Sequence, residues 1–214
     1  MNNSLSIDPQ FIKLLIYRTE ECIKKNKDLL TELDSNIGDA DHGINMSRGF
    51  QAILEISNEL SQLKFNEVLK RAGMTMLTKV GGASGPLYGS FLIGMSKNSP
   101  EEEINLQVFS KMLQAGIDDI KKRGKSDIGE KTMLDVLIPV SNQINKEVNN
   151  FHSNKKLIEN IIKQAEEGLK LTRELEAKKG RASFLGKRSI GHLDPGAMSS
   201  YLLIKSICGI FNTQ

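Results

Sequence analysis

The chain has 214 residues, of which 29 are basic and 26 acidic, so its formal net charge is +3. This length is enough for one medium domain with a substantial core. The near balance of charge argues against nucleic-acid or membrane binding driven by electrostatics, and we expect neither partner. The N-terminus lacks a basic region followed by an apolar run, and no apolar stretch approaches the roughly 20 residues of a membrane span. We therefore expect a single cytoplasmic domain, 1–214.

Apolar residues recur at helical spacing through almost the whole chain, and no alternating stretch typical of a strand is convincing. The spacing predicts eight amphipathic helices, at about 8–33, 46–54, 66–79, 86–95, 100–123, 132–149, 157–172 and 194–211. Asp8-Pro9 and Asp194-Pro195 are each typical of a capping residue followed by proline in the first helical turn. We expect an acidic run at Pro100 to begin the fifth helix. The predicted fold class is all-α, with antiparallel helices in an up-and-down bundle.

Glycine and charge concentrate in alternate connections between these helices. The connections after the second, fourth and sixth helices are plain polar turns, whereas those after the first, third, fifth and seventh contain the segments 34–45, 81–86, 123–131 and 180–196. Short connections favour helices that run up and down, so every odd-numbered connection emerges at the same end of the bundle. The four segments are therefore expected to meet in one site.

The first of these segments holds three aspartates within eight residues, Asp34, Asp39 and Asp41. Carboxylates this close repel one another unless a positive charge lies between them, and an oxygen-only set suits Mg²⁺, Mn²⁺ or Ca²⁺ better than zinc. The alternative is an ordinary loop, since Asp and Gly are also turn and cap residues. The segment is not an EF-hand, because Ile44 and Phe50 occupy the positions of the required Gly and Glu.

A carboxylate cluster, glycine-rich loops before helix starts, and basic residues in the fourth segment together indicate a polyphosphate site. Glycines let backbone N–H groups approach an anion, and helix N-termini add partial positive charge. The known nucleotide motif does not fit. The stretch from Gly180 to Lys187 has five residues between its glycines where a P-loop has four, and Arg188 stands at the Ser/Thr position.

Four strings carry a resemblance to a known family: GDADHGINMSRGF at 38–50, GGASGPLYG at 81–89, RGKSDIGEKTMLDV at 123–136, and GRASFLGKRSIGHLDPGA at 180–197. In this order, over nearly the whole chain, they closely resemble the L subunit of bacterial dihydroxyacetone kinase. The resemblance implies an antiparallel eight-helix barrel that binds ADP or ATP at one end through two Mg²⁺ ions.

The resemblance also implies roles for individual residues. Asp34, Asp39 and Asp41 would be the Mg²⁺ ligands, and with Arg181 they would be the catalytic residues. The implied nucleotide contacts are His42, Gly43, Ile44, Asn45, Ala83, Ser84, Gly124, Met133, Arg181, Asp194, Pro195 and Gly196. Two of these have structural alternatives, because Met133 fits simple core packing and His42 fits a buried, hydrogen-bonded histidine.

The reaction implied by the resemblance is transfer of the γ-phosphoryl group of ATP to dihydroxyacetone held on a separate K subunit. Because the chain begins at its first helix, the resemblance favours the branch that depends on the phosphotransferase system. There, tightly bound ADP is rephosphorylated in place by a phosphohistidine on an M subunit. Two alternatives remain open: a kinase subunit for another small carbonyl or acyl acceptor, and a nucleotide-responsive binder of a transcription regulator.

Overall fold

The computed structural model describes residues 5–100, 103–150 and 153–212 and is helical through most of them. The α-helices are α1 (Pro9–Lys25), α2 (Lys27–Ile37), α3 (His42–Glu55), α4 (Ser57–Leu60), α5 (Phe65–Lys79), α6 (Ser84–Ser96), α7 (Leu106–Gly124), α8 (Leu134–Asn149), α9 (Asn154–Leu171) and α10 (Pro195–Asn212). A 3₁₀ segment, η1 (Arg181–Ser189), precedes α10, and two-residue strands β1 (Leu5–Ser6) and β2 (Glu103–Ile104) pair antiparallel. The all-α fold class is confirmed.

Side-chain capping residues mark the starts of α1 and α7. The Asp8 side chain accepts a hydrogen bond from the Phe11 N–H (2.7 Å) at the start of α1, with Pro9 in the first turn, as predicted. The predicted start of the fifth helix is wrong, because Asn105 caps α7 and the preceding Glu103–Ile104 is extended and paired with β1. Glu101 and Glu102 lie outside the described residues. The β pairing therefore takes the place of the predicted first helical turn.

The first predicted helix, 8–33, is two helices in the structure. Asn26 ends α1: its backbone N–H donates to the Ile23 carbonyl (3.2 Å) and its side-chain amide donates to the Cys22 carbonyl (2.8 Å). A new helix, α2, then runs to Ile37. Asp34 consequently lies in the last turn of a helix, and this fixes one of the three aspartates more firmly than a loop would. The second predicted helix is also followed by a separate short turn, α4.

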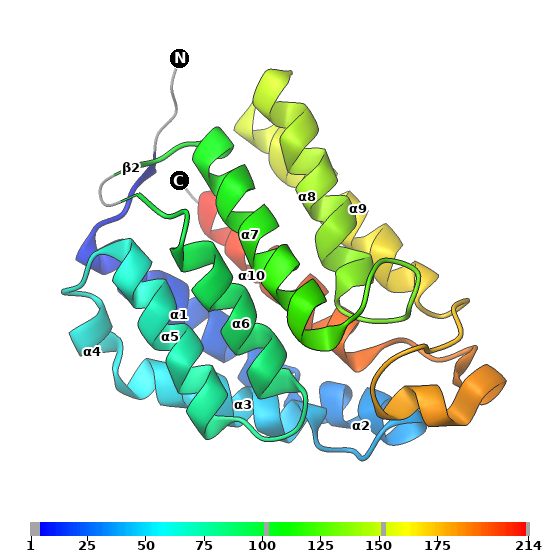
Figure 1. Ribbon diagram of the computed structural model, residues 1–214. Coiled ribbons are helices and arrows are strands. Elements are labelled where there is room, and N and C mark those ends of the chain that lie inside the picture. Colours follow the sequence, from blue (N-terminus) through cyan, green and yellow to red (C-terminus); the bar gives the residue numbers. More distant parts are fainter. Residues whose placement is uncertain (1–4, 101–102, 151–152, 213–214) are drawn as a thin grey trace.

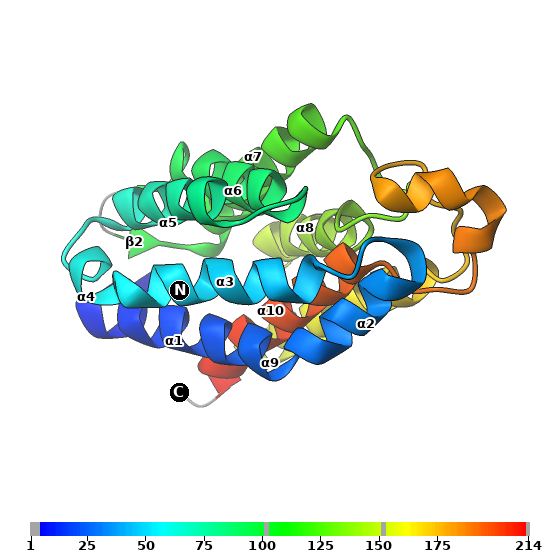
Figure 2. The same cartoon turned by 90° about the horizontal axis from the view of Figure 1, so that it is seen from below.

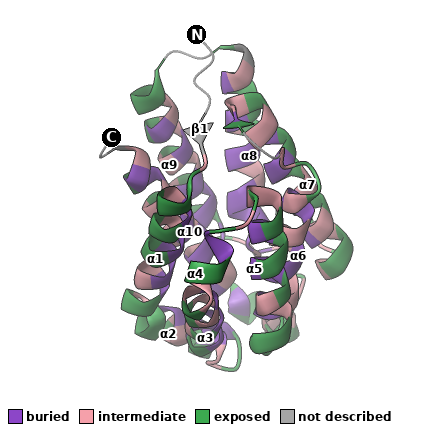
Figure 3. Ribbon diagram, turned by 90° about the vertical axis from the view of Figure 1, so that its left-hand side faces the viewer, coloured by how far each residue is buried: buried purple, intermediate pink, exposed green. Residues whose placement is uncertain are grey.

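The long helices pack side by side in chain order (Figure 1). Contacts join α3 to α5, α5 to α6, α6 to α7, α7 to α8, α8 to α9 and α9 to α10. Helix α1 completes this series of contacts, because it packs on both α3 and α10. Buried residues lie on the inward sides of the helices and exposed residues on their outer sides (Figure 3). Fully buried members of the core include Ile23, Leu30, Met46, Met76 and Leu134. None of the helices in the described ranges has the length and apolar character needed to cross a bilayer.

Four connections lie at one end of the molecule, where α2, the start of α3 and η1 are found (Figure 2). They are the aspartate loop (38–41), the glycine loop (80–83), the α7–α8 loop (125–133) and the Arg181 loop (172–194). The short helix α4, between α3 and α5, and the strand β2, between α6 and α7, lie toward the opposite end (Figure 2). The sequence predicted that alternate connections meet, and these four lie at the same end of the molecule.

Candidate functional site

The three aspartates form a compact carboxylate cluster. Each offers one side-chain oxygen, and these oxygens lie within 4.8 Å of one another. The Asp34 side chain is buried, and its Oδ2 accepts hydrogen bonds from the backbone N–H groups of Asp41 (2.8 Å) and His42 (3.1 Å). Asp41 is half-buried and Asp39 is exposed. A set of carboxylate oxygens with one open side has the chemistry of a site for a hard divalent cation.

The aspartate loop is wound tightly around the Asp34 carboxylate. A Cβ at Gly38 would stand 2.0 Å from Asp34 Oδ1, so glycine is required for this close approach. Ala40 has φ +60°, a conformation that residues with a side chain adopt rarely. These features turn the chain back on itself, so that Asp39 and Asp41 reach the end of α2. Backbone strain of this kind is retained where the surrounding contacts determine it.

The glycine loop passes directly beside the aspartates. Gly82 has φ +64°, and a Cβ there would lie 3.4 Å from both Asp41 Oδ2 and Asn45 Nδ2. Backbone N–H groups can therefore approach a bound anion without a side chain in the way. Ala83 is exposed and Ser84 begins α6. The glycine loop and the N-terminus of α6 therefore lie next to the carboxylate cluster, and both are features that can bind an anion.

His42 links three parts of the site. Its Nδ1 lies 2.9 Å from Ser84 Oγ and its Nε2 lies 2.9 Å from Ser199 Oγ. Burial lowers the pKa of His42 to about 4, so the imidazole is neutral at neutral pH. Both ring nitrogens are used by the protein itself, which matches the buried-histidine alternative, and a phosphate bound to the ring would compete with one of these bonds. Its neighbour Ile44 is exposed, whereas Asn45 is buried.

A buried network of hydroxyl groups contacts His42 through Ser199. The Tyr88 hydroxyl lies 2.8 Å from Ser199 Oγ and 2.9 Å from Ser200 Oγ, and Ser199 donates to the Gly196 carbonyl (3.0 Å). Burial raises the pKa of Tyr88 to about 12. These residues were not predicted from the sequence, because a single Tyr and a Ser-Ser pair on apolar helices carry no motif. The network joins the starts of α3, α6 and α10.

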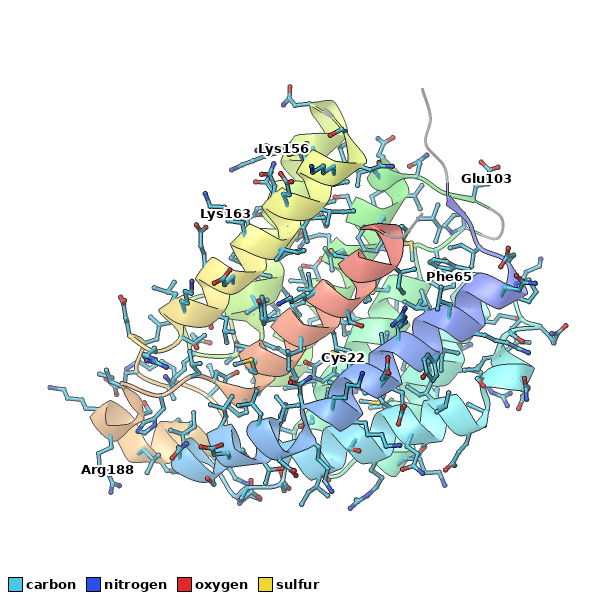
Figure 4. The ribbon with its side chains drawn as sticks, turned by 180° about the vertical axis from the view of Figure 1, so that it is seen from behind. Cys22, Phe65, Glu103, Lys156, Lys163 and Arg188 are labelled. Atoms are coloured by element: carbon cyan, nitrogen blue, oxygen red, sulfur yellow. The ribbon has the colours of Figure 1, made fainter. Side chains whose placement is uncertain are left out.

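The Arg181 loop closes another side of the site. Arg181 Nε lies 2.9 Å from Asp39 Oδ2, although the Arg181 side chain remains exposed. Arg188, at the far edge of η1, points away from the body of the molecule (Figure 4). The structure therefore brings Arg181 to the carboxylate cluster and leaves Arg188 outside it. The 3₁₀ segment η1 was not predicted, since its apolar residues follow no helical period.

Asp194 and Gly196 lie where the Arg181 loop enters α10. Asp194 Oδ2 accepts from the Ala197 N–H (2.7 Å), the predicted cap, and Pro195 follows in the first turn. Burial raises the pKa of Asp194 to about 7, and the carboxylates of Asp135 and Asp34 act in the same direction. A cation held by the aspartate cluster would oppose this accumulation of negative charge.

Met133 and Gly124 occupy the α7–α8 side. Met133 is buried, and a Cβ at Gly196 would lie 3.7 Å from its backbone nitrogen and its Cβ, so Met133 adjoins the start of α10. Gly124 lies at the end of α7 beside Leu87 of α6. Gly43 packs against α2, where a Cβ would come within 2.1 Å of the Lys27 carbonyl oxygen. The nucleotide-binding roles expected of these three residues stay predictions.

Comparison with known proteins places the chain in a family. A model of the DAK2 domain matches residues 36–209. The chain belongs to the DAK2-domain family. This DAK2 chain is 48% identical to PEP-dependent dihydroxyacetone kinase 1, ADP-binding subunit DhaL, of Listeria innocua over 187 residues, which cover 87% of the chain and 89% of that protein. It is 38% identical to PEP-dependent dihydroxyacetone kinase, ADP-binding subunit DhaL, of Escherichia coli over 191 residues, covering 89% of the chain and 91% of that protein.

Longer proteins also contain a matching DAK2 region. Dihydroxyacetone kinase 1 of Saccharomyces cerevisiae is 32% identical over 193 residues, covering 87% of this chain and 32% of that protein. The crystal structure of the dihydroxyacetone kinase from C. freundii in complex with AMP-PNP and Mg²⁺ superposes with a TM-score of 0.72 at 18% identity. That match covers 94% of this DAK2 chain and about a third (34%) of the other chain, and it shows the fold alone.

Proposed function

We propose that this DAK2 chain is the nucleotide-binding subunit of a dihydroxyacetone kinase that depends on the phosphotransferase system. The observation that carries the proposal is the meeting of three carboxylates, a glycine loop and Arg181 at one end of the molecule. The names of the relatives from Listeria innocua and Escherichia coli, both ADP-binding subunits of PEP-dependent dihydroxyacetone kinases, support it. The substrate would be dihydroxyacetone presented by a separate K subunit.

Asp34, Asp39 and Asp41 would hold two Mg²⁺ ions, for which their oxygen donors are chemically suited. Bound Mg²⁺ neutralises charge on the phosphate oxygens and acts as a Lewis acid. The backbone of the glycine loop and the N-terminus of α6 would hold the phosphates, with Ser84 oriented by His42. Arg181, already at the cluster, would stabilise negative charge that develops during transfer. Phosphoryl transfer asks the protein mainly for positioning and electrostatic stabilisation, and these residues supply both.

The phosphoryl donor is the second part of the proposal. ADP would stay bound as a resident cofactor and be rephosphorylated in place by a phosphohistidine on an M subunit. The words "PEP-dependent" and "PTS-dependent" in the names of relatives support this donor over free ATP. Gly124 and Met133 would form part of the nucleoside pocket, and Asp194, Pro195 and Gly196 would close the fourth side of the site with Arg181.

The experiment that tests the proposal is the ultraviolet spectrum of freshly purified, dialysed protein in Mg²⁺, followed by denaturation and chromatography of the released nucleotide. The chain has no Trp and three Tyr, so bound adenine should stand out. We expect near-stoichiometric ADP that phosphorylated M subunit converts to ATP. An empty protein that binds added ATP would support exchange with free nucleotide instead. Absence of adenine binding under every metal condition would refute the nucleotide site.

A further inference from the structure

Lys131 is buried more completely than any other lysine that the structure describes, with 1% of its surface exposed. It lies in the α7–α8 loop, next to the segment expected to face the nucleoside. Burying an ammonium group is costly unless its donors are hydrogen-bonded and its charge is compensated. Its position therefore requires a structural explanation, and no role implied by the sequence resemblance includes it.

The Lys131 ammonium donates hydrogen bonds to two backbone carbonyls, those of Thr172 and His192. These residues lie at opposite ends of the Arg181 loop: Thr172 follows α9 directly, and His192 stands just before the cap of α10. One side chain from a third segment thus holds the two ends of this loop together. Between them the chain makes the excursion that carries Arg181 to Asp39.

Further hydrogen bonds also join the two ends of the Arg181 loop. The Gly191 N–H donates to the Arg173 carbonyl (2.7 Å), and the Asp194 N–H donates to Thr172 Oγ1 (3.2 Å). The Thr172 hydroxyl in turn donates to the Leu169 carbonyl (2.7 Å), which connects the loop ends to α9. Because the Lys131 bonds involve a charged donor, they are the stronger members of this set.

Lys131 is itself held in place by its own loop. Its φ is +59°, and Asp135 fixes the turn around it by accepting from the N–H groups of Gly129 (2.5 Å) and Thr132 (2.7 Å). Desolvation lowers the pKa of Lys131, while the carboxylates of Asp194 and Asp135 raise it. The ammonium thus has two hydrogen-bond acceptors and two neighbouring carboxyl groups, and these partners offset the cost of its burial.

We propose that Lys131 is a positioning residue that clamps both ends of the Arg181 loop and so keeps Arg181 and Asp194 at the nucleotide site. Fixing the ends of a loop limits the conformations its interior can adopt. The clamp itself is independent of the proposed function, and only its consequence for nucleotide retention rests on that function.

The test is hydrogen–deuterium exchange of nucleotide-free protein with Lys131→Met, which keeps the apolar stem and removes the donor. We expect amides within 173–193 to exchange roughly tenfold faster or more, since charged hydrogen bonds are lost at both loop ends, while α5 and α6 keep wild-type protection. The matched control is Lys178→Met, which removes an exposed lysine within the same loop and should leave exchange unchanged. Wild-type exchange of 173–193 in Lys131→Met would overturn the clamp.

A nucleotide readout separates positioning from general stability. In Lys131→Met, bound ADP should dissociate roughly tenfold faster at unchanged protection of α5 and α6, and Lys131→Arg should recover most of the wild-type rate because it keeps a charged donor. If wild-type protein binds no adenine nucleotide, the proposed function fails, and the exchange experiment still decides the clamp. Faster loop exchange with unchanged ADP dissociation would show that the clamp does not position nucleotide-binding residues.

A measurement on unaltered protein covers the case in which Lys131→Met does not fold. Wild-type protein is acetylated with acetic anhydride for increasing times, and each lysine is quantified by mass spectrometry. Lys131 should react far more slowly than exposed Lys178, at a rate that follows the opening of residues 173–193 in hydrogen exchange. Modification of Lys131 as fast as Lys178 would overturn the clamp.

Discussion

At the scale of single residues, the three aspartates are not equivalent. Asp34 lies in α2 and is buried, and one of its carboxylate oxygens accepts hydrogen bonds from two backbone N–H groups. Asp34 therefore stabilises the aspartate loop as well as contributing to the carboxylate cluster. Asp39 is exposed and its Oδ2 meets Arg181. Its removal should therefore disturb metal binding more than the fold.

We expect Asp39→Ala to abolish phosphoryl transfer and to weaken Mg²⁺ binding by roughly tenfold or more, because the proposed site loses a metal ligand. Helical content measured by circular dichroism should remain near wild type. Asp28→Ala is the matched control, since it removes an exposed aspartate from the first turn of α2. Transfer that is intact in Asp39→Ala would refute the metal assignment.

Tyr88 offers a second prediction at this scale. Tyr88→Phe removes the hydroxyl that meets Ser199 and Ser200 and leaves buried polar groups with fewer partners. The free energy of unfolding should fall by about 1–2 kcal/mol, measured by urea denaturation. Tyr17→Phe removes a hydroxyl from a half-exposed tyrosine on α1 and should change stability little. If Tyr88→Phe lowered the free energy of unfolding as little as Tyr17→Phe, the buried network would add no stability.

At the scale of elements, the sequence predicted most helices because apolar period and capping agree, as they do at Asp8-Pro9 and Asp194-Pro195. It missed the break at Asn26 because the apolar period continues across it, and local hydrogen bonds of the Asn26 backbone and side chain end the helix. It also missed Lys131, since a lysine in a polar loop predicts exposure. The spacing of the aspartates indicated a carboxylate cluster. The hydrogen-bond and ion-pair partners of the carboxylate oxygens could not be predicted, because they depend on how the loops fold together.

The contact between α2 and the start of α3 gives a prediction for an element. A Cβ at Gly43 would stand 2.1 Å from the Lys27 carbonyl oxygen and 2.4 Å from Thr31 Oγ1, so Gly43→Ala must push α3 away from α2. We expect a loss of about 1–3 kcal/mol in unfolding free energy, measured by urea denaturation. Gly209→Ala is the opposite control: nothing lies within 4 Å of its added Cβ, and a helical alanine should stabilise by about 0.5–1 kcal/mol.

At the scale of the whole molecule, exposed apolar side chains accompany the site. Phe184 on η1 is 88% exposed, the most exposed of the large hydrophobic residues described. Ile190 in the same loop, Ile128 in the α7–α8 loop and Ile44 at the start of α3 are also exposed. These residues lie in the Arg181 loop, the α7–α8 loop and the start of α3, so an approaching protein would meet apolar surface near the carboxylate cluster.

With the proposed function, this arrangement predicts that Phe184 contributes to docking of the K subunit and not to nucleotide binding. Phe184→Ser should raise the concentration of dihydroxyacetone-loaded K subunit needed for half-maximal transfer by roughly tenfold, because exposed aromatic residues act as anchors in interfaces. The amount of ADP bound after dialysis and the unfolding midpoint should stay at wild-type values, since an exposed side chain contributes little to the stability of the fold. Leu171→Ser is the matched control, because Leu171 is an exposed apolar residue at the end of α9. Loss of bound ADP in Phe184→Ser would assign the side chain to the nucleotide site, and unchanged transfer would exclude this surface from the docking of the K subunit.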